Sequence, residues 1–373
     1  MKRFKSIDIF RGLGMVYIMV GHMIDWWSQP ADDWLFYIHV SLFSALGAAG
    51  FVFVSGISTM ISYRVRLVKV KGSREEKLKH IRLEYYIRAI LILGLALLYN
   101  GIVAIQFFDP AIIWKWFIIL TVAGCLFLAW PLLKASKILR IAVAILIWII
   151  NQIILAILLP FQNQFNLPGL FFYILYNSLD QNPILSFFTF FLVGTVVGEI
   201  IFEFSLIDNK SPKKIIFFKK KIFKPLLISG ILLIAIGILF LYPELFTERI
   251  LTINTNIWWM IYTLGIDLII ISILLSFEIF GKFNTQKSYK FLFYFSYYSL
   301  SLFILQNINF FIFYNSLDRY NIWGFIIASV VLYGLLLRFL YFKLEGKFSL
   351  KVQIGRLTVS IARKFKNHLL ITQ

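Results

Sequence analysis

Apolar residues run through this chain in long stretches that alternate with short segments rich in lysine and arginine. An apolar stretch of about 20 residues crosses the hydrocarbon core of a bilayer as one α-helix. The pattern therefore predicts an all-α, polytopic integral membrane protein with ten spans. These predicted spans are 8–28, 36–63, 86–108, 112–133, 139–160, 184–204, 225–242, 256–280, 291–314 and 321–342.

Two segments do not fit the spanning pattern. Residues 161–183 contain a further apolar piece, FFYILYN, that is too short to span, and we expect a re-entrant or interfacial segment there. The C-terminal tail mixes basic residues with regularly spaced apolar ones, and two alternatives stay open for it: an amphipathic helix on the inner leaflet, or a frayed, solvated end. We accordingly divide the chain into one transmembrane domain, residues 1–343, and a basic amphipathic cytoplasmic tail, residues 344–373.

The distribution of charge fixes the expected orientation. With the N-terminus in the cytoplasm, the segments that stay inside carry 32 of the 37 lysines and arginines, whereas the outer segments carry 3. Basic residues favour cytoplasmic loops, so both termini are predicted to be cytoplasmic. The same bias accounts for the net charge of +19, and we therefore expect no nucleic-acid binding.

Composition narrows the class of protein further. The chain is 60% hydrophobic and 15% charged, whereas a soluble domain is about 45–50% apolar. The single cysteine, Cys125, lies in an apolar run, which excludes a disulfide framework and a cysteine metal site. We find no metal-ligand spacing and expect no metal cofactor. The expected location is the plasma membrane of a prokaryote, as a multi-pass protein, and a homo-oligomer is left open.

The first predicted span carries polar residues on one face. Arg11 and His22 are eleven residues apart, which puts them about 20° from one another and about 16 Å apart along a helix. Asp25 follows His22 by three residues and shares that face. Such groups are costly in a membrane and usually mark a pathway or a site. The plainer alternatives are an Arg11 that reaches the inner headgroups and a neutral His22 bonded to a neighbouring helix.

These residues also carry a resemblance to known enzymes. Arg11, ten residues and then His22 match the Arg-x10-His motif of the acyltransferase type 3 family. The context IDIFRGLGMVYIMVGH resembles the first helix of the related heparan-α-glucosaminide N-acetyltransferase family. GFVFVSGISTMIS (50–62) and RAILILGLALL (88–98) resemble the second and third helices. FSYYSLSLFILQN (295–307) resembles a late helix that often ends in histidine, a position held here by Gln306.

The resemblance implies an acyl-CoA-dependent O- or N-acyltransferase. Such families move an acyl group from cytoplasmic acyl-CoA, here expected to be acetyl-CoA, to an acceptor across the membrane, here expected to be a carbohydrate or a glycolipid. The charge layout suits that reaction: Arg11, with Arg82 and Arg88 at the start of the third span, would bind the phosphates of coenzyme A. His22 would act as general base, with Asp25 holding its tautomer. Membrane anchoring is the alternative for Arg82.

His39 is a second candidate for the base. The first hairpin turns near residue 31, so antiparallel packing puts His22 and His39 at about the same depth. The glucosaminide family places its own histidine in or after the first outer loop, which makes His39 a rival to His22. An interfacial histidine that faces water is the alternative. The small residues that follow either pack helices together or leave room for the pantetheine arm; they are Gly47, Ala48, Ala49, Gly50, Ser55, Gly56 and Ser58.

A transporter is the main rival class, with Arg11, His22 and Asp25 forming a substrate or proton path. Against it, the sequence shows no paired broken helices in two repeated halves. Asp267, in the middle of a predicted span, is a further intramembrane acid, for which an interhelical hydrogen bond is the plainer role. Aspartates and tryptophans of the outer loops would suit a sugar-binding rim, although an aromatic belt explains the tryptophans equally well; they are Asp32, Asp33, Asp109, Trp26, Trp27 and Trp114.

Overall fold

The computed structural model describes residues 4–69, 73–177, 181–208, 211–241, 256–281 and 289–371. These ranges are helical and contain no strand longer than the isolated bridge between Ser28 and Leu317. Nine of the described helices are long and apolar enough to cross a membrane, and the count is ten when a bent pair of shorter helices is taken as one span. The predicted all-α, polytopic fold is confirmed.

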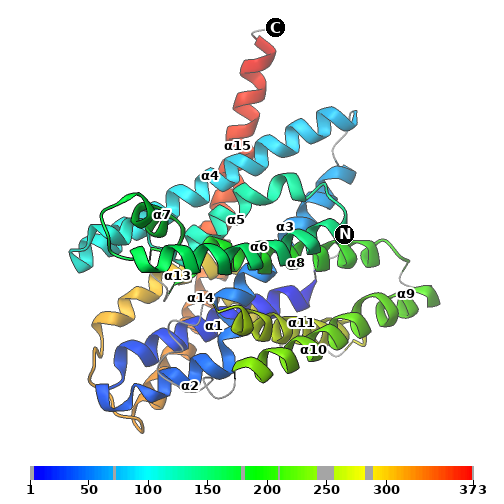
Figure 1. The fold of residues 1–373 in the computed structure, drawn as a ribbon. Helices are drawn as coiled ribbons and strands as arrows, with labels where there is room; N and C mark the ends of the chain where they lie inside the picture. Colours follow the sequence, from blue (N-terminus) through cyan, green and yellow to red (C-terminus); the bar gives the residue numbers. More distant parts are fainter. Residues whose placement is uncertain are drawn as a thin grey trace.

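Most long helices share one general direction in Figure 1. The long helices are α1 (Lys5–Trp27), α3 (Ala48–Lys69), α4 (Arg74–Phe107), α5 (Ile118–Leu132), α6 (Lys137–Leu158), α8 (Ile184–Ser205), α10 (Lys224–Leu241), α11 (Ile257–Ile279), α14 (Ile322–Leu344) and α15 (Leu350–Ile371). The shorter ones are α2 (Trp34–Phe43), α7 (Leu167–Leu175), α9 (Pro212–Phe217), α12 (Lys290–Tyr297) and α13 (Ser299–Leu305).

Local sequence sets several of the helix ends. Ser73 begins α4 with a capping box, because its hydroxyl accepts from the Glu76 amide and the Glu76 carboxylate accepts from the Ser73 amide. Ser136 begins α6 with a simple N-cap, in which its hydroxyl accepts from the amide of Leu139. At its far end α4 stops where Phe108 takes a left-handed conformation with φ of 52°. Helix α6 thus begins two residues before the predicted span 139–160, whereas α4 begins twelve residues before the predicted span 86–108, so part of the predicted cytoplasmic segment is helical.

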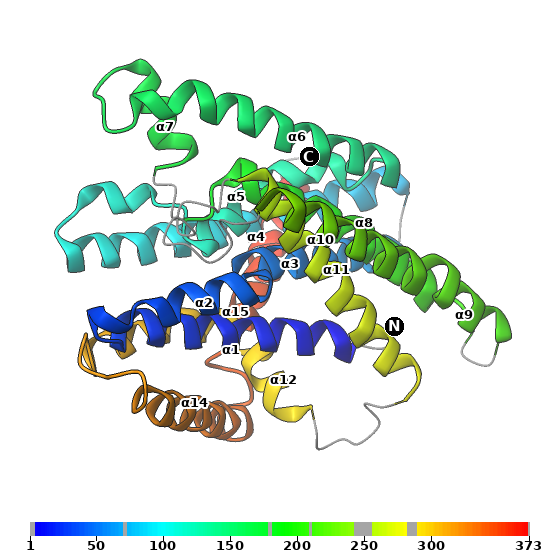
Figure 2. The ribbon, with the colours of Figure 1, turned by 60° about the horizontal axis from the view of Figure 1, so that its bottom comes forward.

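The second predicted span, 36–63, is wrong as one helix. The chain divides it into α2 and α3, joined by a 3-10 turn at Ser44–Leu46 and by Gly47. A glycine among small residues weakens a helix, which gives the chain a place to turn. Helix α2 packs beside α1 in both views (Figures 1 and 2), and α3 alone is long enough to span.

The ninth predicted span, 291–314, is not straight either. Helices α12 and α13 meet at an angle of 73°, because Tyr298 leaves the helical region with φ of −98° and ψ of 12°. A 3-10 stretch, Gln306–Phe311, follows α13. The bend turns the start of α13 toward the interior of the molecule, where Ser299 is buried.

Glycines bring α3 and α8 into backbone contact. A β-carbon on Gly56 would lie 2.1 Å from the carbonyl oxygen of Phe191, and one on Gly194 would lie 2.1 Å from that of Phe53. Only glycine permits this approach, which is the usual basis of close helix packing in membranes. The packing explanation of the small residues therefore holds for this face of α3.

A buried ionic triad also ties α3, α6 and α8 together. The guanidinium of Arg140 is fully buried and pairs with Glu199, whose other oxygen pairs with Arg64. Arg140 also donates to the hydroxyl of Thr195 at 3.0 Å. Glu199 is the shared counter-charge, so removing it would leave the fully buried Arg140 without a partner, which is strongly destabilising. The triad therefore fixes these three helices relative to one another.

The two segments outside the spanning pattern are both ordered in part. Between α6 and α8 the chain forms α7, which packs on α6, and the indoles of Trp114 and Trp116 donate to the Ile174 carbonyl. No helix within the described part of 161–183 is long enough to span, in line with the predicted non-spanning segment. The tail forms α15, which crosses the direction shared by α4, α6 and α8 (Figure 1).

Candidate active site

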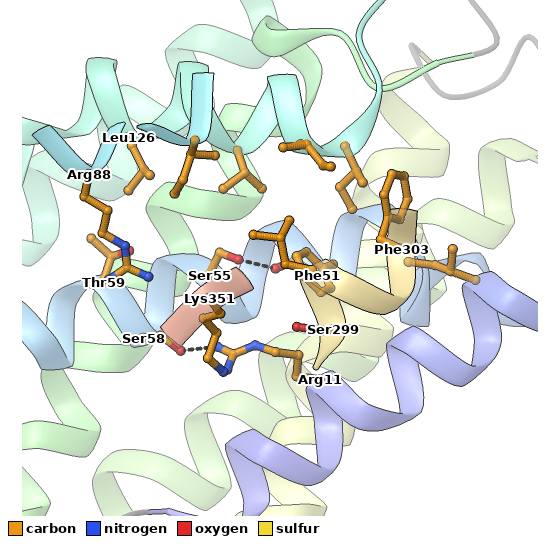
Figure 3. Close-up of a pocket in the computed structure, with 16 residues that line it drawn as sticks. Arg11, Phe51, Ser55, Ser58, Thr59, Arg88, Leu126, Ser299, Phe303 and Lys351 are labelled. Carbon is orange, nitrogen blue, oxygen red and sulfur yellow. Dashed lines mark hydrogen bonds between the residues drawn. The ribbon is translucent and has the colours of Figure 1, made fainter. Parts of the chain in front are cut away.

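Two cavities lie along the polar face of α1. The first, which we call the cation pocket, has a volume of about 120 Å³ and is drawn in Figure 3. Its polar lining combines basic side chains and hydroxyls, and helices α4 and α5 add apolar side chains. The polar lining residues are Arg11, Ser55, Ser58, Thr59, Arg88, Ser299 and Lys351.

The basic side chains enter the cation pocket from separate helices. Arg88 comes from α4 on one side, and Arg11 and Lys351 come from α1 and α15 on the other (Figure 3). The Nη2 atom of Arg11 donates to the Ser58 hydroxyl at 2.5 Å. Arg11 is buried and points into the interior, so this side chain lies inside the protein, not among headgroups as in the snorkelling alternative.

Arg82 lies elsewhere. Its guanidinium sits 5.8 Å from the centre of the Tyr86 ring, and the residue is exposed. It is absent from the described lining of both cavities. The structure thus brings Arg11 and Arg88 together and leaves Arg82 apart from them.

The second cavity, the histidine cavity, is larger, at about 550 Å³. His22, Asp25 and His39 all line it. The hairpin of α1 and α2 therefore brings the two histidines to one cavity, as their distances from the turn predicted. The remaining lining includes the cation Lys115 and is rich in aromatic rings and amides, namely Tyr17, Trp26, Phe36, Tyr99, Gln106, Phe107, Phe117, Gln181, Asn182, Phe187, Trp259, Phe303, Asn307 and Phe310.

His39 is the better fixed of the two imidazoles. Its ring stacks on Tyr17 with centroids 4.3 Å apart, and its Nε2 atom lies 3.3 Å from the Tyr17 carbonyl oxygen. A carbonyl only accepts, so Nε2 carries the hydrogen and Nδ1 is the basic nitrogen of the neutral ring. Gly21 makes room for this ring, because a β-carbon there would lie 3.0 Å from Nε2.

His22 and Asp25 are held differently. The His22 ring stacks on Trp26, four residues on, with centroids 4.8 Å apart. Within the part of the chain that the structure describes, no hydrogen bond joins the Asp25 carboxylate to the His22 imidazole. The expected tautomer-holding contact is therefore not formed here, although both side chains face the same cavity.

The two cavities share part of their walls. Ile18, Ile118 and Phe303 line both of them. On α1, Ile18 lies between Arg11 and His22, so one helix face runs from the cation pocket, past the shared wall, to the histidine cavity. The eleven-residue spacing predicts this arrangement, with about 16 Å of helical rise between its ends.

Comparison with known proteins bears on this arrangement. The sequence profile of the family described as heparan-alpha-glucosaminide N-acetyltransferase, catalytic, matches residues 3–236, which is more than half of the chain. The chain belongs to this family. The match includes α1 to α9 and most of α10, and with them Arg11, His22, Asp25, His39 and Arg88. A comparison with the curated proteins finds no match.

Membership in this N-acetyltransferase family indicates that the protein is a membrane acetyltransferase.

Beyond residue 236 the structure adds residues to the cation pocket that the sequence analysis did not predict, namely Ser299, Phe303 and Lys351. At the end of the late helix, Gln306 is buried outside the described lining of both cavities, whereas Asn307 lines the histidine cavity and bonds the Tyr99 hydroxyl at 3.1 Å. Asn307, not Gln306, therefore lines the cavity that contains the two histidines.

Of the residues predicted to form a sugar-binding rim, only Trp26 is in the described lining of the histidine cavity. The indole of Trp27 instead donates to the Asn309 carbonyl at 2.7 Å, and Asp32 accepts from the Arg319 amide at 2.9 Å, so these residues tie the end of α1 and the turn after it to the segment that precedes α14. Asp267 is buried near Gly50, outside the described lining of both cavities. Within the described residues no group of three metal-binding side chains gathers.

Proposed function

We propose that this protein transfers an acyl group, expected to be acetyl, from cytoplasmic acyl-CoA to a carbohydrate or glycolipid acceptor on the outer side of the membrane. Family membership supports an acetyltransferase. The assignment of donor and acceptor rests on one observation: a cationic pocket and a cavity with two histidines share a wall formed by Ile18, Ile118 and Phe303. The helical rise between Arg11 and His22, about 16 Å, is on the scale of a pantetheine arm, which is on the order of 15–20 Å long.

The cation pocket is the proposed donor site. Coenzyme A carries phosphate groups at one end, and charge-assisted bonds from guanidinium groups are strong, specific partners for them. Arg11 and Arg88 take this role, while Ser55, Ser58 and Thr59 line the same wall. Arg82 remains a proposed donor-binding residue only as a charge on the approach to the site, because it lies outside the described lining. No metal ion is required in this scheme.

The histidine cavity is the proposed site of transfer. Nδ1 of His39 takes the proton from the acceptor hydroxyl or amine, whose oxygen or nitrogen then attacks the thioester carbonyl carbon. The carbon–sulfur bond breaks, and the proton passes to the departing thiolate, which leaves as coenzyme A thiol. This is direct transfer within a ternary complex. His22 shares the cavity and is the alternative base, and Asp25 is assigned to contact with the acceptor.

The lining of the histidine cavity favours a carbohydrate acceptor. Aromatic rings offer flat apolar faces, and amides and a carboxylate offer hydrogen bonds to hydroxyl or amino groups. Its volume of about 550 Å³ lies within the roughly 300–1,000 Å³ of ligand sites. The bias of basic residues supports an orientation in which the N-terminal end of α1 is cytoplasmic, so the acceptor would enter from outside. A prokaryotic plasma membrane remains the expected location.

The test is acyl transfer by the purified protein in lipid nanodiscs. Labelled acetyl-CoA is supplied with amino sugars, neutral sugars and glycolipids, and both labelled product and free thiol are measured. We expect product with at least one of these acceptors, and about 10²–10⁴ less of it with His39→Ala. A transporter would have no reason to bind coenzyme A, so failure of the wild type to bind it would return the protein to that class.

A further inference from the structure

The C-terminal tail contributes a side chain to the cation pocket. Lys351, in the first turn of α15, lines this pocket with Arg11 and Arg88 (Figure 3). Three basic side chains thus converge from α15, α1 and α4, and the described lining contains no acidic residue. The profile match ends at residue 236, so Lys351 lies outside the matched region.

The start of α15 is fixed to the bent ninth span. After α14 the chain reverses through Glu345 and Gly346, with φ of 43° and 77°. The Ser301 hydroxyl donates to the Phe348 carbonyl at 2.8 Å and accepts from the Leu350 amide at 2.9 Å. The backbone on the N-terminal side of Lys351 is therefore anchored by Ser301, independently of the lysine side chain.

The rest of α15 has the pattern of a helix at a membrane surface. Ile354, Thr358 and Ala362 recur every four residues and are buried, where α15 packs against α4. Its other faces expose basic and apolar side chains together, among them Arg356, Arg363, Lys364, Leu357 and Phe365. Basic and large apolar side chains on one helix favour the interface of an anionic membrane. Such a helix holds its first turn at a fixed depth.

We propose that Lys351 is a third donor-binding residue, whose ammonium binds a phosphate group of coenzyme A beside Arg11 and Arg88. This inference rests on the proposed function of the cation pocket and adds the tail to it. Lysine binds phosphate as a point charge, without the planar fork of arginine. A purely structural role is the competing explanation, because the Lys351 ammonium contacts the Ser296 carbonyl at 3.4 Å and the Ser296 hydroxyl contacts Asp8.

Two ligands separate these explanations. Coenzyme A carries the phosphates, and pantetheine has the same arm without them. Loss of a phosphate-binding charge should therefore weaken the binding of coenzyme A and leave the binding of pantetheine unchanged. Dissociation constants for both are measured in nanodiscs for wild type, Lys351→Gln, Lys351→Met and Lys351→Arg. Lys347→Gln is the matched control, because it removes an equal charge four residues earlier on an exposed residue.

We expect Lys351→Gln and Lys351→Met to weaken coenzyme A binding by roughly tenfold, the scale of one charge-assisted hydrogen bond, and to leave pantetheine binding unchanged. Lys351→Arg should retain most of the affinity, and Lys347→Gln all of it. Unchanged coenzyme A binding in both neutral variants would overturn the inference while leaving the proposed function intact. Equal losses for both ligands would assign Lys351 to the packing of α15 instead. If the wild type binds coenzyme A no better than pantetheine, the proposed function itself fails.

Discussion

The two cavities along α1 are suited to different kinds of ligand. The cation pocket is small, about 120 Å³, and its basic side chains come from three separate helices. The histidine cavity is several times larger, about 550 Å³, and is walled by aromatic rings and amides. A small pocket with fixed charges suits a ligand whose charged end never varies. A wide, aromatic cavity suits acceptors that share a ring shape but differ in their substituents.

The two cavities should also differ in how strongly a small displacement of their side chains affects the reaction. Coulomb attraction falls slowly with distance, so a cation displaced by a fraction of an ångström still attracts a phosphate. Proton transfer needs a hydrogen-bond distance, and a small misplacement costs rate steeply. Changes in the cation pocket should therefore appear in donor affinity, and changes around the histidines should appear in turnover.

The largest expected effect is on turnover at the histidine end. His39→Ala should lower acyl transfer by about 10²–10⁴, because it removes the imidazole whose tautomer Tyr17 fixes. Coenzyme A binding should stay within a few-fold, since the charged groups lie at the other end of the face. Turnover at saturating donor, beside equilibrium donor binding, measures both. His22→Ala is the matched comparison, and a larger loss there would make His22 the base.

The next effect is on donor affinity at the cation end. Arg11→Ala should weaken acyl-CoA binding by roughly tenfold or more, because a hydrogen bond to a charged group contributes about 1.5–3 kcal/mol. Arg11→Lys should recover only part of this, since it keeps the charge but not the fork. Titration of acyl-CoA against the three proteins measures the series. Equal affinities would remove the charge argument for the donor site.

A smaller effect should follow from crowding His39 without removing it. Gly21→Ala places a β-carbon 3.0 Å from Nε2 of His39, so the ring must shift and turnover should fall several-fold. Donor affinity should not change. Gly94→Ala is the control, because a β-carbon there meets no atom within 4 Å. Equal activity in the two variants would show that the position of the His39 ring does not limit the reaction.

The smallest effect is expected at Arg82. Arg82→Ala removes an exposed charge outside the described lining, so acyl-CoA affinity should change by no more than about twofold. Arg88→Ala, six residues on, should weaken binding as Arg11→Ala does. Parallel titrations at low and high salt measure the pair. A loss at Arg82 equal to that at Arg88 would extend the donor site beyond the cation pocket.

The features that were predicted correctly from the sequence depend on the positions of residues within a single helix. The shared face of Arg11, Ile18 and His22 follows from helical period alone, which holds wherever the helix stays regular. The same period carried a signal that was missed. Arg82 and Arg88 are six residues apart, which separates them by about 120° around α4, so they could not both face one pocket.

What the sequence could not predict comes from contacts between distant segments. The break between α2 and α3 and the 73° bend at Tyr298 lie within apolar runs that read as continuous spans. Tertiary packing decides such breaks, because local propensity is only a weak prior. Lys351 lies in a segment that the sequence shows to be a basic amphipathic tail, but nothing in the sequence indicated that this tail would pack against α4 and α13.

The ionic triad of Arg64, Arg140 and Glu199 has a consequence for how the chain is assembled. Helices enter the membrane in the order of synthesis, so α3 and α6 bring their arginines before α8 supplies the carboxylate. Arg64 and Arg140 belong to the basic residues counted on the cytoplasmic side, and in the finished fold Arg140 is completely buried against Glu199. We therefore expect α3, α6 and α8 to reach their final packing only once α8 is in place, because Arg140 has no counter-charge until then. The contribution of Glu199 is thus expected in assembly, since this residue is outside the described lining of both cavities.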